Sequence, residues 1–365
     1  MDREIKRYLI GLKLISHLDR RINKVLEVFG SPDKVWHASV RELSESLSIS
    51  KELAQEIAGQ RQRIDLNEEL KRLKDFDGEL LSVFDTSYPQ LLKEISSTPV
   101  FFVQGSLVKT YDYGVAIVGS RRASAYGKEF AFRLARQLSD LGVTVVSGVA
   151  RGIDSAAHSG ALQGAGGTIG VLGCGLDVIY PPENRQLYAE ISRNGSLISE
   201  YALGAPPLPF NFPARNRIIS GLSQGVVIVE ASERSGALIT ADFALDQGRD
   251  VMVVPGNIRS SVSQGCHKLI KQGAYLIDSV DDVLDILDIK HKIGRTPGNA
   301  KDKPKLDISS EEQIILDYLG WEPKQVDQIV QAVDLNVSRV STLLTILELK
   351  GIVKQDFGSN YLRIQ

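Results

Sequence analysis

Two arginines flank an asparagine near the middle of the chain, in the stretch FNFPARNRIISG at residues 210–221. The order is Arg215, Asn216, Arg217, shortly after a proline and directly before an apolar run. Proline suits the first turn of a helix, so we expect a helix to begin here. Arginine presents a planar fork of N–H donors that matches phosphate oxygens. The stretch therefore predicts a phosphate-binding element at the start of a helix.

Helical spacing predicts that the two arginines point in different directions. Arg215 lies three residues before Ile218 and falls on the same apolar face, whereas Arg217 points well away from it. We expect Arg215 to turn inward onto Glu200 or Glu230 and to support the site. Arg217 should face solvent, where it either binds the ligand or gives further support. A structural ion pair beside an ordinary surface charge is the alternative explanation of the same pattern.

Glycine follows the ends of five predicted strands, and arginine occurs in two of these loops. Glycine lets an anion approach backbone N–H groups, and a helix that follows aims the positive end of its dipole at that anion. Tight strand-to-helix turns also use glycine for shape alone, but shape does not call for arginine. We therefore expect a phosphate or nucleic-acid site at this edge of the sheet. The loops contain Gly119, Ser120, Arg121 and Arg122; Gly148, Arg151 and Gly152; Gly173 and Gly175; Ser235, Gly236 and Thr240; and Gly256 and Asn257.

Motifs of other chemistries are missing from the sequence. It has neither the dinucleotide-binding glycine pattern nor a P-loop. Asp154, Ser155 and His158 could be imagined as a hydrolytic triad, but without a G-x-S-x-G elbow we interpret them as a hydrogen-bonded polar trio. Glu200 and Glu230 each end a predicted strand at the site edge. Either could act as a general acid or base, or hold an arginine in place by ion pairing.

The elements that must position these residues are predicted between Gly114 and about Leu287. Short runs rich in valine and isoleucine alternate there with helical patterns, as buried parallel strands and their crossover helices do. The segment between the first two runs places apolar residues on one helical face and ends at Gly142. The pattern predicts an α/β fold with a doubly wound parallel sheet. The strand candidates are VAIVG, VTVVSG, TIGVLG, SLISE, VVIVE, VMVVPG and AYLI.

The flanks of this sheet differ from it in pattern. Residues 1–75 have helical periodicity, with breaks at Ser31-Pro32 and at residues 48–50. Paired short helices can grip DNA through glycine hairpins, but the second turn, SLSIS, has no glycine, which favours a plain interaction module. Residues 289–305 form a basic linker with proline and glycine. Residues 306–365 predict a winged helix, whose third helix opens at Asn336 and whose wing is GIVKQDFGSNYLRI.

Charge argues against duplex reading by this last domain. From Lys305 onward the chain has 6 Lys and Arg against 9 Asp and Glu, a net charge of −3. The third helix has cations only at Arg339 and Lys350, which is too little positive charge to contact the phosphates of a duplex well. We therefore expect this domain to contact protein rather than to read duplex DNA.

Composition sets the remaining bounds. The chain has 365 residues and a net charge of −2, so attraction to nucleic acid must come from local patches. Cys174 and Cys266 are far apart and have no CxxC spacing, which indicates a reducing compartment and no metal site. We expect no signal peptide and no membrane span, because charges interrupt the apolar residues of the N-terminus and no apolar run is long enough. The expected location is the cytoplasm.

The central motifs resemble the DNA processing protein A family, DprA, also called Smf. Spacing as well as residue type agrees across the central domain, which with its lead-in covers residues 76–288. The flanks are similar to the SAM-like and winged-helix additions of that family. The motifs are VAIVGSRRASAYG, VVSGVARGIDSAAHSGAL, GVLGCGLDVIYPPEN, LISEY, FPARNRIISGLS, VVIVEASERSGALITADFALDQGRDVMVVPG and GCHKLIKQGA, preceded by DTSYPQLLKEISSTPVFFVQGSL.

The resemblance implies a non-enzymatic protein of natural transformation and DNA recombination, with an extended Rossmann-like domain. Members bind and protect single-stranded DNA, dimerise and help load RecA recombinase onto it, and no cofactor is implied. Backbone recognition with little sequence preference is the expected mode, and Phe210, Phe212 and Tyr180 are candidate stacking residues. Carried over to this chain, the DNA pocket comprises Gly119, Ser120, Arg121, Gly148, Arg151, Gly152, Phe212, Arg215, Asn216 and Arg217.

An enzyme is the alternative. The stretch EASERSGALITADFAL is more distantly similar to nucleoside-monophosphate phosphoribohydrolases, which have P-G-G-x-G-T-x-x-E in this region. Gly236 and Thr240 match that motif only loosely. The glutamate four residues after the glycine is replaced by Thr240, which counts against hydrolysis. A scaffold whose nucleotide site has become purely structural is a third reading, disfavoured by Arg121 and Arg151 in the loops.

Overall fold

The computed structural model describes residues 3–15, 17–18, 21–97, 100–109, 112–289, 309–320, 323–333, 335–350, 352–356 and 360–363. The chain forms two compact units, Met1–Gly294 and Arg295–Gln365. Each unit has hydrophobic core of its own, so each can be described by itself. The predicted basic linker lies, apart from its first residue, outside the described residues.

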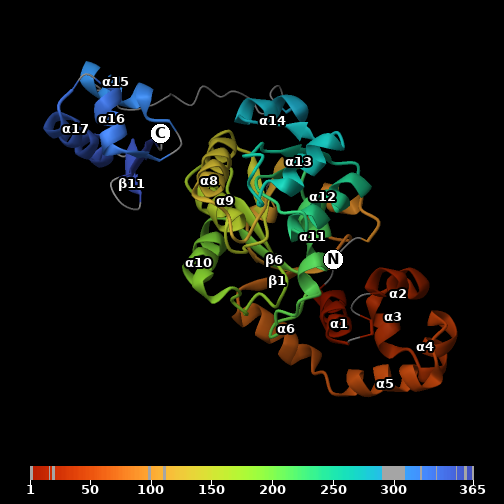
Figure 1. The fold of residues 1–365 in the computed structure, drawn as a ribbon. Coiled ribbons are helices and arrows are strands. Elements are labelled where there is room, and N and C mark those ends of the chain that lie inside the picture. The colour runs from red at the N-terminus through yellow and green to blue at the C-terminus, as the bar shows by residue number, and fades with distance from the viewer. Residues whose placement is uncertain are drawn as a thin grey trace. The chain divides into compact units, whose positions relative to one another are not determined.

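The first unit is built on a nine-stranded sheet in the order β1-β2-β6-β5-β4-β3-β7-β8-β9 (Figure 1). All neighbours from β6 to β9 along this order pair in parallel. The prediction of a doubly wound parallel sheet is therefore confirmed. The strands are β1 (Gly78–Leu81), β2 (Phe101–Gly105), β3 (Gly114–Val118), β4 (Thr144–Ser147), β5 (Thr168–Leu172), β6 (Ser196–Ser199), β7 (Gly225–Ile228), β8 (Asp250–Val253) and β9 (Tyr275–Leu276).

Strand order reverses at β3. From there the chain steps through β4 and β5 to β6 on one side, and then returns to place β7, β8 and β9 on the other side. The loops after β3 and β7 thus leave the sheet in opposite directions, which opens a crevice beyond their carboxyl ends. Gly119 begins the first of these loops and Val229 begins the second.

Two antiparallel strands at one edge were not predicted. β1 pairs with β2, and β2 pairs with β6, both in antiparallel register. They come from the lead-in segment, where the runs are GELL and FFVQG. Such short runs carry no clear periodicity, so only the pairing of β2 with β6 and of β1 with β2 identifies them as strands.

Helices cover both faces of the sheet, as the alternation along β3 requires. Val115 and Ile117 pack in one hydrophobic cluster with α8 and α9, whereas Ala116 and Val118 pack in another with α11, α12 and α13 (Figure 1). The helices of this part are α7 (Gln90–Lys93), α8 (Ala125–Asp140), α9 (Ile153–Ala161), α10 (Arg185–Asn194), α11 (Asn211–Gly221), α12 (Gly236–Asp246), α13 (Gln264–Lys271) and α14 (Val280–Ile286), with single 3₁₀ turns at Leu107–Lys109 and Pro182–Asn184.

Six short helices precede the sheet, with breaks where the sequence predicted them. Ser31 precedes α3 and the Ser50 side chain caps α5 by accepting a hydrogen bond from the backbone N–H of Leu53. Apolar residues of these helices share one cluster with Phe102 and Leu172 of the sheet, so both belong to one unit. The helices are α1 (Arg3–Leu14), α2 (Ile22–Phe29), α3 (Pro32–His37), α4 (Val40–Leu47), α5 (Lys51–Gln62) and α6 (Leu66–Asp75).

The second unit is the predicted winged helix. Asn336 opens the third helix by accepting a hydrogen bond from the backbone N–H of Arg339 at 2.9 Å. The wing is the antiparallel hairpin of β11 and β12. The elements are α15 (Ser310–Tyr318), β10 (Lys324–Gln325), α16 (Val326–Ala332), α17 (Val337–Leu349), β11 (Val353–Asp356) and β12 (Asn360–Arg363).

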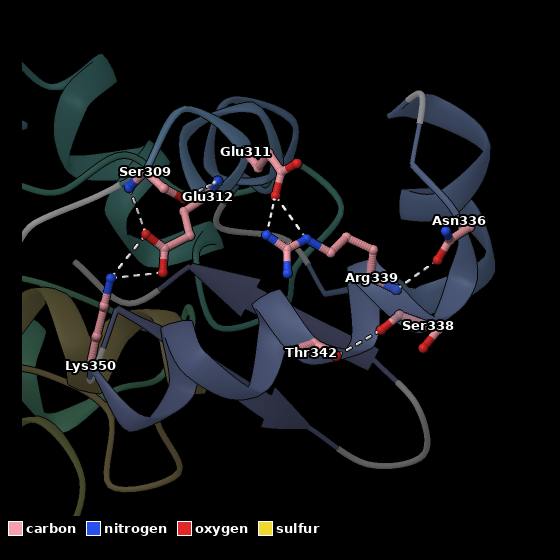
Figure 2. A network of polar contacts seen from close by, with 8 residues as sticks. All are labelled: Ser309, Glu311, Glu312, Asn336, Ser338, Arg339, Thr342 and Lys350. Atoms are coloured by element: carbon pink, nitrogen blue, oxygen red, sulfur yellow. Dashed lines mark hydrogen bonds and ion pairs between the residues drawn. The ribbon is translucent and has the colours of Figure 1, made fainter.

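Both cations that the sequence places at the third helix have acidic partners within the unit. Figure 2 shows Arg339 donating to Glu311 from Nε at 2.8 Å and from Nη2 at 2.5 Å. Lys350 donates to both carboxylate oxygens of Glu312, at 2.7 and 2.9 Å. These ion pairs hold α17 on α15 and leave little free positive charge on α17 for DNA phosphates.

Candidate nucleic-acid interface

A cavity of about 770 Å³ opens at the switch point of the sheet. The loops after β3, β4, β7 and β8 all contribute to its wall, together with the start of α11 and of α12. Ten of the predicted site residues line it: Gly119, Ser120, Arg121, Arg122, Phe212, Arg215, Asn216, Ser235, Gly236 and Thr240. Gly148, Arg151, Gly152 and Arg217 do not line it.

Arg215 and Asp154 form the buried floor of the cavity. Arg215 is only 4% exposed, and its Nη1 donates to the carbonyl oxygen of Gly148 at 2.8 Å and to that of Val171. Asp154 accepts hydrogen bonds from the backbone N–H groups of Gly148 and Ala150, at 3.2 and 3.3 Å. A Cβ on Gly148 would lie 2.5 Å from the Arg215 guanidinium. That Cβ would also lie 2.7 Å from Asp154 Oδ2, so glycine at this position leaves room for both charged groups beneath the loop after β4.

Burial shifts both charged groups toward their neutral forms. It raises the pKa of Asp154, and the charge of Arg215 and the two N–H donors oppose that shift. It also lowers the pKa of Arg215, against the opposing charge of Asp154. Each group thus stabilises the other's charge in a place where either alone would be costly. The pair is a fixed internal support for the cavity wall.

The partners predicted for the two arginines were wrong. Arg215 contacts neither Glu200 nor Glu230 through any hydrogen bond in the described part of the chain. Arg217 takes Glu200 instead, with Nη2 2.6 Å from Oε1, and the two side chains are only 19% and 17% exposed. Arg217 therefore does not face solvent as predicted. The reason is tertiary, since Glu200 after β6 lies beside Arg217, while the Arg215 guanidinium is buried beneath the loop after β4, where the charge of Asp154 acts on it.

Arg121 and Arg122 stand at the rim and are exposed. No ion pair engages either of them among the described residues. The Arg121 guanidinium lies 5.4 Å from the ring centre of Phe212, a cation–π contact that orients it over the cavity. Phe212 in turn lies 5.3 Å from the ring of Tyr180. The rim thus combines cationic donors with two neighbouring aromatic faces.

Glu230 holds the arginine loop from below. It is 4% exposed and accepts hydrogen bonds from the backbone N–H and the hydroxyl of Ser124, at 2.9 and 2.5 Å. Ser124 in turn caps α8 by accepting from the N–H of Gly127 at 3.0 Å. A Cβ at Gly127 would lie 2.6 Å from the Glu230 carboxylate, so the absence of one admits the carboxylate to the helix start. The acid therefore positions the loop rather than an arginine.

The remaining predicted residues brace the wall. The Ser235 side chain caps α12, and Asn216 Nδ2 donates to the carbonyl of Gly236 at 3.3 Å, which ties α11 to α12. Gly152 has φ +78°, and a Cβ there would lie 2.2 Å from the carbonyl oxygen of Ser120. The glycine therefore lets the loops after β3 and β4 touch. Arg151 pairs with Glu183 outside the cavity.

The polar trio near α9 is not a catalytic triad. His158 bonds to the hydroxyl of Thr168 at 2.7 Å, and Ser155 donates to the carbonyl of Ala150 at 2.6 Å. Asp154 instead serves the loop and Arg215. Among the described residues, no group of three or more His, Cys, Asp or Glu side chains could hold a metal ion. None of the helices described is long and apolar enough to cross a membrane.

Sequence reasoning missed several wall residues. Asp154 was considered only as part of the trio, although a carboxylate just after a glycine turn at a helix start is a recognisable loop-holding signal. Pro207 and Pro209 line the cavity from the segment after β6, and Ser261 and Val262 line it from the loop after β8. Those four carry no charge, so their place in the site depends on the fold alone.

The fold and the cavity together define a Rossmann-like protein with an arginine-rimmed site at the switch point of its sheet. The model of the family described as DNA recombination-mediator protein A matches residues 79–288, and that of the DprA winged helix domain matches residues 299–358. The chain belongs to this DprA/Smf family, a family of DNA processing and recombination.

Individual relatives agree with this membership. Protein Smf from Escherichia coli (strain K12) is 41% identical over 280 residues, which are 76% of this chain and 75% of that protein. DNA processing protein A from Streptococcus pneumoniae superposes with a TM-score of 0.68 at 38% identity, over 77% of this chain and 98% of that one. DNA processing protein A from Helicobacter pylori, studied for its single-stranded DNA binding mode, has a TM-score of 0.52 at 31% identity over 57% and 95%.

Proposed function

We propose that this chain binds single-stranded DNA at the cavity, protects it, and helps to load a RecA recombinase onto it during DNA recombination and natural transformation. Family membership and the likeness to the Helicobacter pylori protein support the nucleic-acid ligand. We also propose that the protein acts in the cytoplasm as a homodimer formed through the sheet domain. The domain boundaries near residues 75, 288 and 305 stay predictions.

One observation carries the DNA proposal: the placement of Arg121 over Phe212 at the mouth of the cavity. An arginine that forms no ion pair in the described part of the chain can bind a backbone phosphate. The ring beneath it, with Tyr180, offers a face on which a base stacks. Both contacts ignore base identity, so binding should have little sequence preference and strong salt dependence.

A phosphoribohydrolase role has less support. Thr240, which replaces the catalytic glutamate of those enzymes, is 1% exposed and lines the cavity. Asp154 is the one acidic residue among the described residues of the wall. Its Oδ2 already accepts hydrogen bonds from two backbone N–H groups, and the charge of Arg215 opposes the rise of its pKa. We therefore propose that the site binds nucleic acid without turning it over.

A salt titration of binding tests this function. Anisotropy of labelled oligothymidylate and of a matched duplex would be measured with wild type, Arg121→Ala and Arg193→Ala. Arg193 is an exposed cation in the last turn of α10, just before β6 begins, so it lies at the amino ends of the parallel strands, away from the cavity at their carboxyl ends. We expect preference for the single strand, and a loss of about tenfold or more in Arg121→Ala alone. Equally weak binding to single strand and duplex, unchanged by Arg121→Ala, would contradict DNA binding at the cavity.

The recombinase step needs its own readout. RecA filament formation on single-stranded DNA coated with a single-strand-binding protein would be followed with and without this chain. Faster filament assembly with wild type, and slower assembly with Arg121→Ala, supports delivery through the cavity. Release of base from nucleoside monophosphates, measured on the same preparations, would instead favour the enzyme.

A further inference from the structure

The loop after β8 extends the wall of the cavity beyond the predicted site. Ser261 and Val262 line the cavity, and the same loop carries Ile258 and Arg259 three residues earlier. Ile258 is 82% exposed, and Arg259 is exposed beside it. A single exposed isoleucine needs no special explanation. Ile258, however, lies beside a cation in a loop that also lines the cavity, which points to a role in binding.

Hydrogen bonds hold this loop in one shape. The backbone N–H of Arg259 donates to Asn257 Oδ1, and that of Ser260 donates to the Asn257 carbonyl, both at 2.9 Å. His267 Nε2 lies 3.0 Å from the carbonyl oxygen of Gly256. The exposure of Ile258 is therefore built into a braced turn. A surface that is already ordered can bind a ligand without the entropy cost of ordering the loop.

An aromatic side chain joins this loop to the arginine loop. Tyr126 lies in the first turn of α8, a few residues after Arg122, and is 46% exposed. Its hydroxyl lies 3.5 Å from the carbonyl oxygen of Pro255, at the start of the loop after β8. Tyr126 thus stands between the cationic rim of the cavity and the turn that presents Ile258. No acidic residue pairs with Arg259 among the residues that the structure describes.

We propose that Tyr126, Ile258 and Arg259 form an outer surface on which the DNA strand continues after it leaves the cavity. Arg259 binds a backbone phosphate, and Tyr126 and Ile258 give neighbouring bases a flat aromatic and apolar contact. The inference rests on the proposed function and adds the direction of the strand, from the loop after β3 across β7 toward β8. Continuity with the cavity and the unpaired charge of Arg259 favour nucleic acid over a protein occupant.

Oligonucleotide length separates the outer surface from the cavity. Binding of oligothymidylates of about 5 and about 20 nucleotides would be compared, since a short strand occupies the cavity alone. The variants are Arg259→Glu and Tyr126→Ala, with Arg193→Glu as the control of equal charge change. For the long strand we expect Arg259→Glu to weaken binding by about tenfold and to lower the salt slope by about 0.7. Tyr126→Ala should weaken it about fivefold or more.

The outcomes distinguish the two proposals. Unchanged affinity for the short strand, with weaker binding of the long one, supports the outer surface. The outer surface would be overturned if Arg259→Glu and Tyr126→Ala bound the long strand as tightly as the control Arg193→Glu. Arg121→Ala would still test the cavity in that case. Equal weakening for both lengths would also overturn it, because the residues would then belong to the cavity site. Circular dichroism of each variant verifies the fold.

Discussion

The Glu230 carboxylate accepts two hydrogen bonds from Ser124, one from its backbone N–H at 2.9 Å and one from its hydroxyl at 2.5 Å. The acid comes from the end of β7 and the serine from the start of α8. The pair therefore links the two loops that diverge at the switch point. It sets the position of the arginines between them.

Glu230→Gln should loosen the arginine loop. The amide keeps the size of the side chain but loses a charge-assisted acceptor, so we expect about 1–2 kcal/mol lower stability and several-fold weaker DNA binding. Urea unfolding and oligonucleotide anisotropy measure the two effects. Glu129→Gln, within α8, is the control and should change neither the stability nor the DNA affinity. Lower stability with unchanged binding would show that Glu230 supports only the fold.

Gly152→Ala should damage the site where Gly142→Ala does not. Both glycines have positive φ, +78° and +83°, so both variants add backbone strain, and Gly152, with ψ −119°, lies outside the left-handed helical region that other residues can adopt. Only at Gly152 would the new Cβ meet another atom, the Ser120 carbonyl oxygen at 2.2 Å. We expect the loop after β3 to shift and DNA affinity to fall about tenfold in that variant alone. Matching affinities in the two variants would contradict this contact's role.

His158 should make the protein less stable in mild acid. Burial lowers the pKa of His158 to about 3, so the native state keeps it neutral while the unfolded chain takes up a proton below about pH 6.5. The free energy of unfolding should then decrease as the pH falls below 6.5, by up to about 1.4 kcal/mol per pH unit. Urea unfolding between pH 7 and 5 would show it.

His158→Gln provides the test of that assignment. It removes the titrating group while keeping a hydrogen-bonding side chain toward Thr168, so its stability should depend less on pH. Asp154 acts with the opposite sign, because burial raises its pKa. An unchanged slope in His158→Gln would assign the acid sensitivity to another group.

Arg339→Ala should leave DNA binding unchanged. Glu311 already engages this guanidinium through two hydrogen bonds (Figure 2). We expect less than about a twofold change in affinity for duplex and for single strand, since the lost cation was not free to bind phosphate. A large loss of duplex binding would instead assign DNA contact to α17. Arg121→Ala, measured in parallel, shows the size of effect that a rim cation produces.

Local patterns were sufficient for much of the fold. The strands from β3 to β8 were predicted because buried parallel strands appear as apolar runs, and β9 was predicted from its apolar run although its two residues are exposed. The winged helix followed from the order of three helices and a hairpin. β1 and β2 were missed because they precede the alternation of strands and helices that begins at Gly114, and their short runs carry no periodicity of their own.

For the candidate site, too, the sequence predicted some features and missed others. Glycines and arginines after successive strands were enough to place it at the carboxyl edge of the sheet, and the helical wheel was enough to turn Arg215 inward. Which acid each arginine meets was not accessible to either pattern. Asp154 lies 61 residues before Arg215 and Glu200 lies 17 residues before Arg217, and only the tertiary packing of α9, β6 and α11 decides which acid lies near which arginine.

The sequence by itself determined the seven strands from β3 to β9, which loops carry phosphate-binding residue types, and to which family the motifs are similar. These properties depend on neighbours within a few turns of chain. The tertiary structure alone decided that the chain reverses at β3, that the loops after β3 and β7 open one cavity, and that a buried Asp154–Arg215 pair supports it. Those features depend on the order of strands across the sheet, which the sequence of each strand does not specify.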